Sequence, residues 1–397
     1  MRKIWSFSFY FLYYAGVAAM MPYMVLYYQY RGLSGAQIGL ITGIIPLITL
    51  VSVPFWTGLA DTTGRHRLVM SLAMLVGISA MAIFPLVDTF VLIFGAAVVL
   101  QIFFSPTGAF ADSATMQMLG ERKELYGRVR LGGTIGFGIV ATFAGILVEN
   151  QGLKMAFWGG AVWFFLAFLT TQKFTYAKVA KSDVSRLKGL QVLAKNPHWL
   201  IFLLLAFTGG VAFTATNTYF FPFMKELGAS EGLMGVALTV GTLAEIPVML
   251  FVNRLIVRFK PYGTLVIAII FTGLRLLLFA IALTPTFVIF VQIINAFTFP
   301  IMWVAGVAYA DAYAPHGLRT TAQGLFGVMV SGIGAATGGF IGGLLLANLG
   351  GRGLYMIFGI FVFVVLLLAT LIRVKLPPEE APATNQLNAE RAESAEI

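Results

Sequence analysis

Twelve apolar runs, each long enough to cross a lipid bilayer as a helix, occupy most of this chain. A spanning helix needs about 20 mostly apolar residues. Of the 397 residues, 59% are hydrophobic and only 11% are charged, whereas soluble chains carry about 25% charged residues. The predicted spans are 4–30, 37–60, 68–87, 89–118, 129–148, 153–172, 199–223, 232–253, 263–283, 286–312, 321–347 and 353–373. The sequence therefore predicts an all-α membrane protein with twelve transmembrane helices, and it excludes a soluble or disordered chain.

The chain has no cysteine and only three histidines, which excludes several kinds of chemistry. Without cysteine there is no disulfide, no thiolate nucleophile and no cysteine-ligated metal. His66, His198 and His316 lie far apart in the sequence, so a histidine-rich metal centre is not expected. No pairing of a nucleophile with a base is visible either. We therefore expect no enzyme activity, no metal and no organic cofactor.

Most basic residues fall on one side of the predicted membrane. When the loops are assigned alternately to the two sides, 20 Lys and Arg lie on one side and 4 on the other, while Arg130 and Arg275 lie inside spans. The positive-inside rule places the richer side, with both termini, in the cytoplasm. The net charge of +10 is then a consequence of topology and does not indicate a nucleic-acid partner. We expect a multi-pass protein of a bacterial cytoplasmic membrane.

Two segments of the first half recur in the second half. Residues 145–154 resemble 343–352 at an offset of 198, and residues 32–39 resemble 228–235 at an offset of 196. Two six-helix halves in the same orientation follow, and such parallel repeats are typical of transporters that bind solute near the middle of the membrane. The predicted domains are 1–173, a linker 174–197, a second half 198–375 and a tail 376–397, with the linker and tail on the cytoplasmic side.

A glycine-rich, basic turn separates the second and third spans. It reads Gly58-Leu-Ala-Asp61-Thr-Thr-Gly64-Arg65-His66-Arg67. Glycine permits sharp turns and close helix approach, and Asp61 could cap the next helix or pair with a base. A capped turn with flanking positive charge is the simpler interpretation. The whole string, however, resembles the signature loop of the major facilitator superfamily, which implies that Gly58, Asp61, Gly64, Arg65 and Arg67 control conformation.

Two further strings resemble one branch of that superfamily, which contains lactose permease and the phenylpropionate and nucleoside permeases. They are Phe103-Phe-Ser-Pro-Thr-Gly-Ala-Phe-Ala-Asp112 and Leu125-Tyr-Gly-Arg128-Val-Arg130-Leu-Gly-Gly. In that branch an acid in span four and an arginine in span five line the substrate cavity 18 residues apart. Asp112 and Arg130 match that spacing, so the resemblance implies that both bind substrate.

The second half continues the resemblance but departs from lactose permease. Ala244-Glu245 in span eight resembles the phenylpropionate permease, and Arg275 in span nine matches an arginine shared across the branch. Asn295 and Thr298 stand where lactose permease has a histidine and a glutamate, and Thr242 stands where it has its sugar-binding glutamate. Galactoside recognition is therefore not implied. Any proton coupling must use another acid, namely Glu245 with Arg275, or else Asp112.

The cost of burying charge selects the same residues without any resemblance. An ionisable group at the centre of a spanning helix costs about 2.5–3.5 kcal/mol on insertion scales, so such groups face a wet cavity and have partners. We expect Asp112 to pair with Arg130 and Glu245 with Arg275, and the alternative is that these are purely structural ion pairs. Further candidates to line the cavity are Tyr13, Tyr14, Asn217 and Asn295.

Taken together, the sequence predicts a monomeric, proton-coupled symporter that takes up a small organic solute by rocking of its two halves. Sugars, nucleosides and aromatic acids fit equally well. An exporter or an uncoupled facilitator on the same fold is the closest alternative. Drug–proton antiporters usually carry Gly-Pro in span five, where this chain has Gly136-Phe137, which favours uptake. A membrane-embedded enzyme or sensor is the alternative from another class.

Overall fold

The computed structural model describes residues 2–120, 122, 125–176, 193, 195–314 and 318–377, and in these residues every regular element is a helix. The first half contains α1 (Arg2–Met20), η1 (Met21–Tyr23), α2 (Met24–Tyr30), α3 (Gly35–Thr63), α4 (His66–Ile83), η2 (Phe84–Leu86), α5 (Phe90–Phe104), α6 (Thr107–Leu119), α7 (Tyr126–Gln151) and α8 (Lys154–Thr171). The helices α3 and α5 each begin after a polar residue whose side chain accepts a hydrogen bond from the first turn. Ser34, for example, forms a capping box with Gln37 at the start of α3.

The second half is built in the same way. It contains α10 (Pro197–Thr218), α11 (Phe220–Glu226), α12 (Glu231–Ile281), α13 (Pro285–Val291), η4 (Gln292–Phe297), α14 (Phe299–Tyr313), α15 (Arg319–Gly327), the π-helix η5 (Val328–Gly334) and α16 (Ala335–Val374). Within the predicted linker, residues 177–192 and 194 lie outside the described residues, as do 378–397 of the predicted tail. The domain boundaries therefore stay predictions.

Within the described residues, twelve membrane crossings fit into ten long apolar helices. Two of the ten cover 51 residues (Glu231–Ile281) and 54 residues (Thr321–Val374), roughly twice the length that one crossing needs. Each reverses at a residue with positive φ, Lys260 (φ 59°) in α12 and Gly350 (φ 65°) in α16. Pro261 follows Lys260, and a residue before proline is disfavoured in the helical region. The predicted all-helical fold of twelve spans is confirmed.

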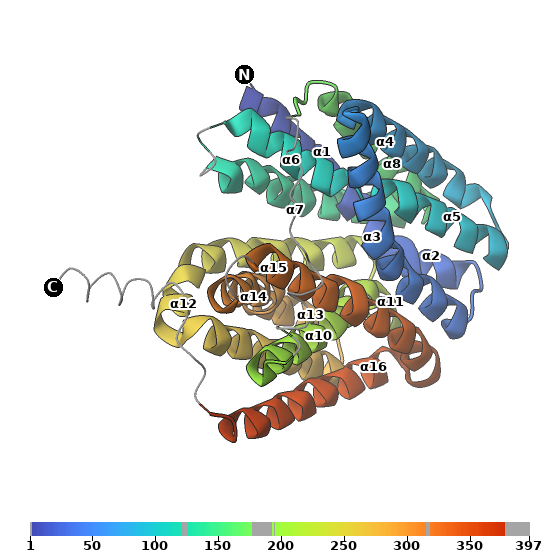
Figure 1. Ribbon diagram of the computed structural model, residues 1–397. Coiled ribbons are helices and arrows are strands. Elements are labelled where there is room, and N and C mark those ends of the chain that lie inside the picture. The colour runs from blue at the N-terminus through green and yellow to red at the C-terminus, as the bar shows by residue number, and fades with distance from the viewer. Residues whose placement is uncertain are drawn as a thin grey trace, which may run out of the picture.

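The helices form two bundles, with α1 to α8 above and α10 to α16 below in Figure 1. Two pairs of helices make the most extensive contacts between the bundles, α3 with α16 and α7 with α12. Backbone meets backbone there, because a Cβ added to Gly343 would lie 2.5 Å from the Cα of Gly39, and one added to Gly145 would lie 2.5 Å from the carbonyl oxygen of Glu231. Only glycine permits this approach.

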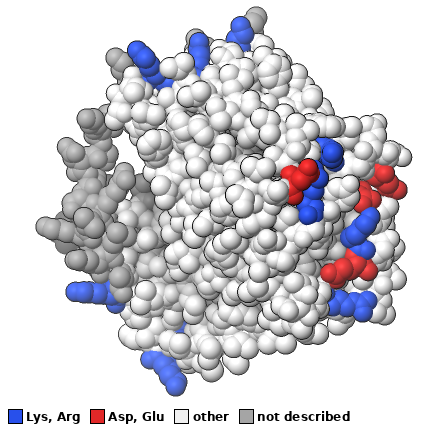
Figure 2. All heavy atoms as spheres, turned by 90° about the vertical axis from the view of Figure 1, so that its right-hand side faces the viewer, with Lys and Arg blue, Asp and Glu red and all other residues white. Residues whose placement is uncertain are grey.

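These contacts lie toward one end of the molecule, which we call the seam end. It is opposite to the turn at Asp61–Arg67, and we call the other end the motif end. Figure 2 looks onto the seam end and shows acidic and basic side chains close together there. The loops at this end carry four basic and four acidic residues, namely Arg31, Lys154, Lys225, Arg352, Asp88, Glu149, Glu226 and Glu231. The seam end is thus neutral overall, whereas the chain as a whole is basic.

Candidate functional site

A polar cavity of about 320 Å³ lies between the two bundles, on the motif-end side of the seam contacts. Both halves supply its walls, through α1 and α7 on one side and through α10, α12, η4 and α14 on the other. The lining residues are Tyr14, Arg130, Gly133, Thr134, Phe137, Phe213, Asn217, Leu238, Gly241, Thr242, Glu245, Arg275, Gln292, Asn295 and Phe299. Four of the predicted substrate residues and both members of the predicted coupling pair therefore line one cavity. A fifth, Asp112, lies beside it in contact with Arg130.

The first-half cluster centres on Arg130. Its Nη1 lies 3.4 Å from both carboxylate oxygens of Asp112 and donates to the hydroxyl of Tyr126 at 2.6 Å, while Nη2 donates to the hydroxyl of Tyr14 at 3.3 Å. Tyr10 donates to Asp112 at 2.5 Å. The Arg130 and Asp112 side chains are 45% and 41% exposed, so the expected pair forms and stays open to solvent. Tyr126 was missed, although its spacing of four residues from Arg130 on a helix signals the contact.

The second-half cluster is a chain of four side chains. Arg275, only 6% exposed, donates through Nη1 to Asn295 at 2.7 Å and through Nη2 to Gln292 at 2.5 Å. Asn295 in turn donates through Nδ2 to Glu245 at 2.6 Å. The expected direct pairing of Glu245 with Arg275 is wrong, because the amide of Asn295 lies between them.

A local change of helix type explains this chain. Gln292 to Phe297 form the 3₁₀-helix η4, in which residues three apart lie one above the other. Gln292 and Asn295 therefore face Arg275 together. Thr298, just after η4, donates to the carbonyl and the side-chain oxygen of Asn295 at 2.7 and 3.3 Å, which orients the amide. Gln292 was missed, and its three-residue spacing from Asn295 is the signal that could have found it.

The predicted aromatic lining divides between two neighbouring tyrosines. Tyr14 lines the cavity. Tyr13 packs instead on Phe9, Phe104 and Phe164 within the first bundle, with ring centroids 5.4 Å apart in each case. The expectation that Tyr13 lines the cavity is wrong, because consecutive helix residues point about 100° apart.

Across the cavity, Phe213 and Phe299 stack with centroids 3.8 Å apart. Asn217, whose Nδ2 is bound to the carbonyl of Phe213 at 2.9 Å, lies beside them on the same wall. The second-half wall thus presents a flat apolar face next to polar groups.

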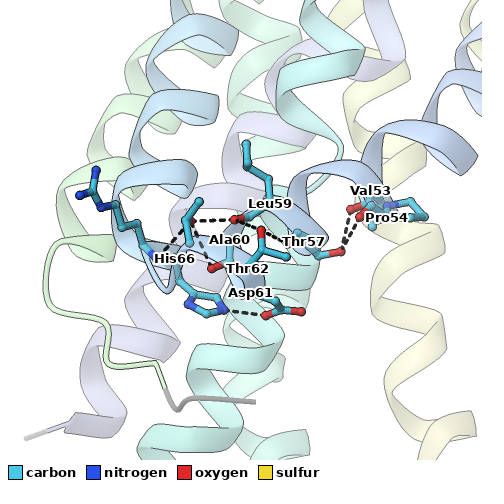
Figure 3. A network of polar contacts seen from close by, with 11 residues as sticks. Val53, Pro54, Thr57, Leu59, Ala60, Asp61, Thr62 and His66 are labelled. Carbon is cyan, nitrogen blue, oxygen red and sulfur yellow. Dashed lines mark hydrogen bonds and ion pairs between the residues drawn. The ribbon is translucent and has the colours of Figure 1, made fainter. Parts of the chain in front are cut away.

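At the motif end, Figure 3 shows Asp61 turned toward His66, whose Nε2 lies 2.8 Å from the carboxylate. Gly64 closes α3 with φ 66°, as a sharp turn requires. Gly58 has open space where its Cβ would be, so the expected close helix approach at Gly58 is not seen. Asp61 pairs within its own turn, and α4 has no side-chain cap, so the simpler capping interpretation is wrong.

The start of the predicted linker rests on this turn. Arg67 donates to the carbonyl oxygen of Phe174 at 2.8 Å, and the rings of His66 and Tyr176 stack 5.3 Å apart at 16°. Burial raises the pKa of Tyr176, which keeps its hydroxyl protonated and able to donate to the sulfur of Met70 at 2.8 Å. Asp61, Arg65, His66 and Arg67 line a separate cavity of about 1090 Å³ with this segment.

Two bundles of spanning helices around a shared cavity with charged groups from both halves define a membrane transporter, not an enzyme. The chain belongs to the MFS_1 like family, whose profile matches residues 4–358. It is similar to the maltose permease of Geobacillus stearothermophilus (28% identity over 371 residues, 91% of this chain and 93% of the relative). It is also similar to the xanthosine permease of Escherichia coli strain K12 (25% identity over 364 residues, 86% of each).

Among solved structures, a point variant of the nucleoside transporter NupG superposes with a TM-score of 0.83 at 17% identity. The match covers 94% of this chain and 99% of that one. This likeness concerns the fold alone. The family match and the two permeases confirm the resemblance to major facilitator permeases that the sequence motifs indicated.

Proposed function

We propose that this protein is a proton-coupled symporter that takes up a small organic solute by alternating access. The observation that carries the proposal is the Glu245–Asn295–Arg275–Gln292 chain on the wall of a cavity shared by both halves. We place both termini in the cytoplasm, because the motif end holds most of the basic residues. We further propose that the protein works as a monomer in a bacterial cytoplasmic membrane.

The cavity walls suit a solute that combines hydrogen-bonding groups with an apolar face. Asn217, Gln292, Thr134 and Thr242 offer amides and hydroxyls, and the stacked Phe213–Phe299 pair offers a flat surface. Sugars, nucleosides and aromatic acids share these properties. The two permeases similar to this chain are named for maltose and xanthosine, which favours a sugar or a nucleoside as the solute.

Glu245 is the proposed proton carrier. It lines the cavity, where it can exchange a proton with water, and among the described lining residues it is the only carboxylate. Asn295 links it to Arg275 by one hydrogen bond on each side, at 2.6 and 2.7 Å. A change in the charge of Glu245 therefore alters the hydrogen bonding of the buried Arg275 through a single amide, that of Asn295. Asp112 is the alternative carrier, since it contacts Arg130 directly and accepts a hydrogen bond from Tyr10.

The test is a proteoliposome assay of uptake and of exchange, with a pH-sensitive dye, for maltose and xanthosine. If Glu245 carries the proton, Glu245→Gln abolishes accumulation against a gradient but keeps solute exchange, because glutamine imitates the protonated, loaded form. Asp112→Asn is the matched variant for the alternative carrier. Uphill uptake with proton flux in Glu245→Gln would overturn the assignment of Glu245. A wild-type protein that moves solute without proton flux would overturn symport and favour the facilitator.

A further inference from the structure

Two equivalent seams join the halves at the seam end, one between α3 and α16 and the other between α7 and α12. The internal repeat relates them, since Gly145 of α7 corresponds to Gly343 of α16 at the offset of 198. Both glycines approach the facing backbone closely. In shape, therefore, the seams are alike.

Their charged groups differ at one position. Four residues beyond each of these glycines, α7 has Glu149 and α16 has Ala347. Ala347 packs against the backbone of Gly35. Glu149 instead crosses to the other half, where its Oε2 accepts a hydrogen bond of 2.9 Å from the backbone nitrogen of Gly232 in α12. Among the residues that the structure describes, only the α7–α12 seam thus carries a carboxylate that spans the two halves.

The group that Glu149 binds is the first turn of α12, whose N–H groups have no acceptor within the helix. Ser230 accepts from Leu233 at 3.3 Å, and Glu231 pairs with Lys225 at 2.6 Å. Glu149 supplies the acceptor for the N–H of Gly232, which lies between Glu231 and Leu233. A carboxylate is favoured at a helix N-terminus, and such charge-assisted bonds are stronger than neutral ones.

The glycine at position 232 is what lets the carboxylate reach the backbone. A Cβ there would lie 2.6 Å from the Oε2 of Glu149, well inside van der Waals contact. Any other residue would push the carboxylate away. The hydrogen bond therefore needs two particular residues on helices of different halves, the acceptor Glu149 on α7 and the glycine donor Gly232 on α12.

We propose that Glu149 is the latch of the seam end: its bond to Gly232 holds the two halves closed there and must break before that end can open. This rests on the alternating access of the proposed function, but not on symport or on the solute. A cap within one half would survive a rocking movement. Glu149 and Gly232 lie on different halves, so separation of α7 from α12 removes the bond.

The test uses a pair of cysteines, because the chain has none of its own. Gln151→Cys in the first half and Asn348→Cys in the second are exposed sites at the seam end, and both accept spin labels. Distance distributions are measured by double electron–electron resonance in lipid nanodiscs, without solute or proton gradient. We expect Glu149→Ala to raise the ratio of open to closed molecules about tenfold, equivalent to about 1.4 kcal/mol.

Two further variants make the result specific. Glu149→Gln keeps an acceptor oxygen without charge, so its shift should be smaller than that of Glu149→Ala. Asn150→Ala is the matched control, because Asn150 is the next residue and bonds only within its own helix, to the carbonyl of Ile146 at 2.8 Å. It should leave the distribution unchanged.

An unchanged distribution in Glu149→Ala would overturn the latch, as would an equal shift in Asn150→Ala. If Glu149→Ala does not fold, Glu149→Gln is used instead, and a distance distribution unchanged from wild type would overturn the latch. A wild-type protein without proton flux would overturn symport while leaving the latch intact. Failure of the latch with coupled uptake preserved would leave symport intact.

Discussion

Gln292 offers a measurable test of the buried arginine chain. Arg275 is 6% exposed, and its Nη2 donates to Gln292 at 2.5 Å, while its Nε has no hydrogen-bond partner among the residues that the structure describes. Gln292→Leu would remove the acceptor of the Nη2 group, so that a second nitrogen of the guanidinium lacks its hydrogen bond. A hydrogen bond to a charged group contributes about 1.5–3 kcal/mol, and leucine offers no acceptor in place of the amide oxygen. We therefore expect the free energy of unfolding to fall by about 2–3 kcal/mol.

The measurement is equilibrium unfolding in mixed micelles with increasing denaturing detergent. Gln292→Glu is the informative partner variant, because a carboxylate restores an acceptor and compensates the charge of Arg275, so most of the stability should return. Ile293→Leu is the matched control, since Ile293 is in the same 3₁₀-helix and is 50% exposed. A loss below about 0.5 kcal/mol in Gln292→Leu would refute the reasoning, because surface substitutions produce changes of that size.

Two other predictions concern the first half. Arg130→Gln or Asp112→Asn should weaken solute binding more than tenfold, measured by calorimetry with the transported solute, while stability changes by less than about 1 kcal/mol because the pair is exposed. Arg128→Gln, exposed two residues earlier on α7, should bind normally, and wild-type affinity in both pair variants would remove these residues from the site. Asp61→Asn should slow transport several-fold with unchanged affinity. It breaks the contact of the Asp61 carboxylate with His66, which lies far from the polar cavity between the two bundles. The control is Thr62→Val, whose hydroxyl bonds only to its own helix, and a fall in affinity with normal turnover of bound solute would show that Asp61 has another role.

The number and limits of the spans followed from the sequence, because a bilayer leaves the backbone no alternative to the helix. Hydropathy is a local property, and the predicted spans match the observed helices to within a few residues. Asp112, Arg130, Glu245 and Arg275 were found for a related reason. A charge in a spanning helix is costly enough to stand out in any sequence.

The direction in which each side chain points was decided by the tertiary structure. These helices are apolar on all sides, so hydropathy does not fix their rotation, and Tyr13 and Tyr14 could not be told apart before the bundles were packed. The 3₁₀ geometry at Gln292–Phe297 is equally invisible in an apolar run. It is what placed Asn295 between Glu245 and Arg275.

The contact of Glu149 with Gly232 shows the same limit most clearly. The sequence places both residues in short loops or at helix ends, 83 positions apart, and nothing local marks them as partners. The internal repeat predicts two similar halves, and the close glycine contacts of both seams follow it. Which seam carries the carboxylate that reaches across depends on how the halves meet, since a hydrogen bond between rigid bundles exists only when their packing brings donor and acceptor within about 3 Å.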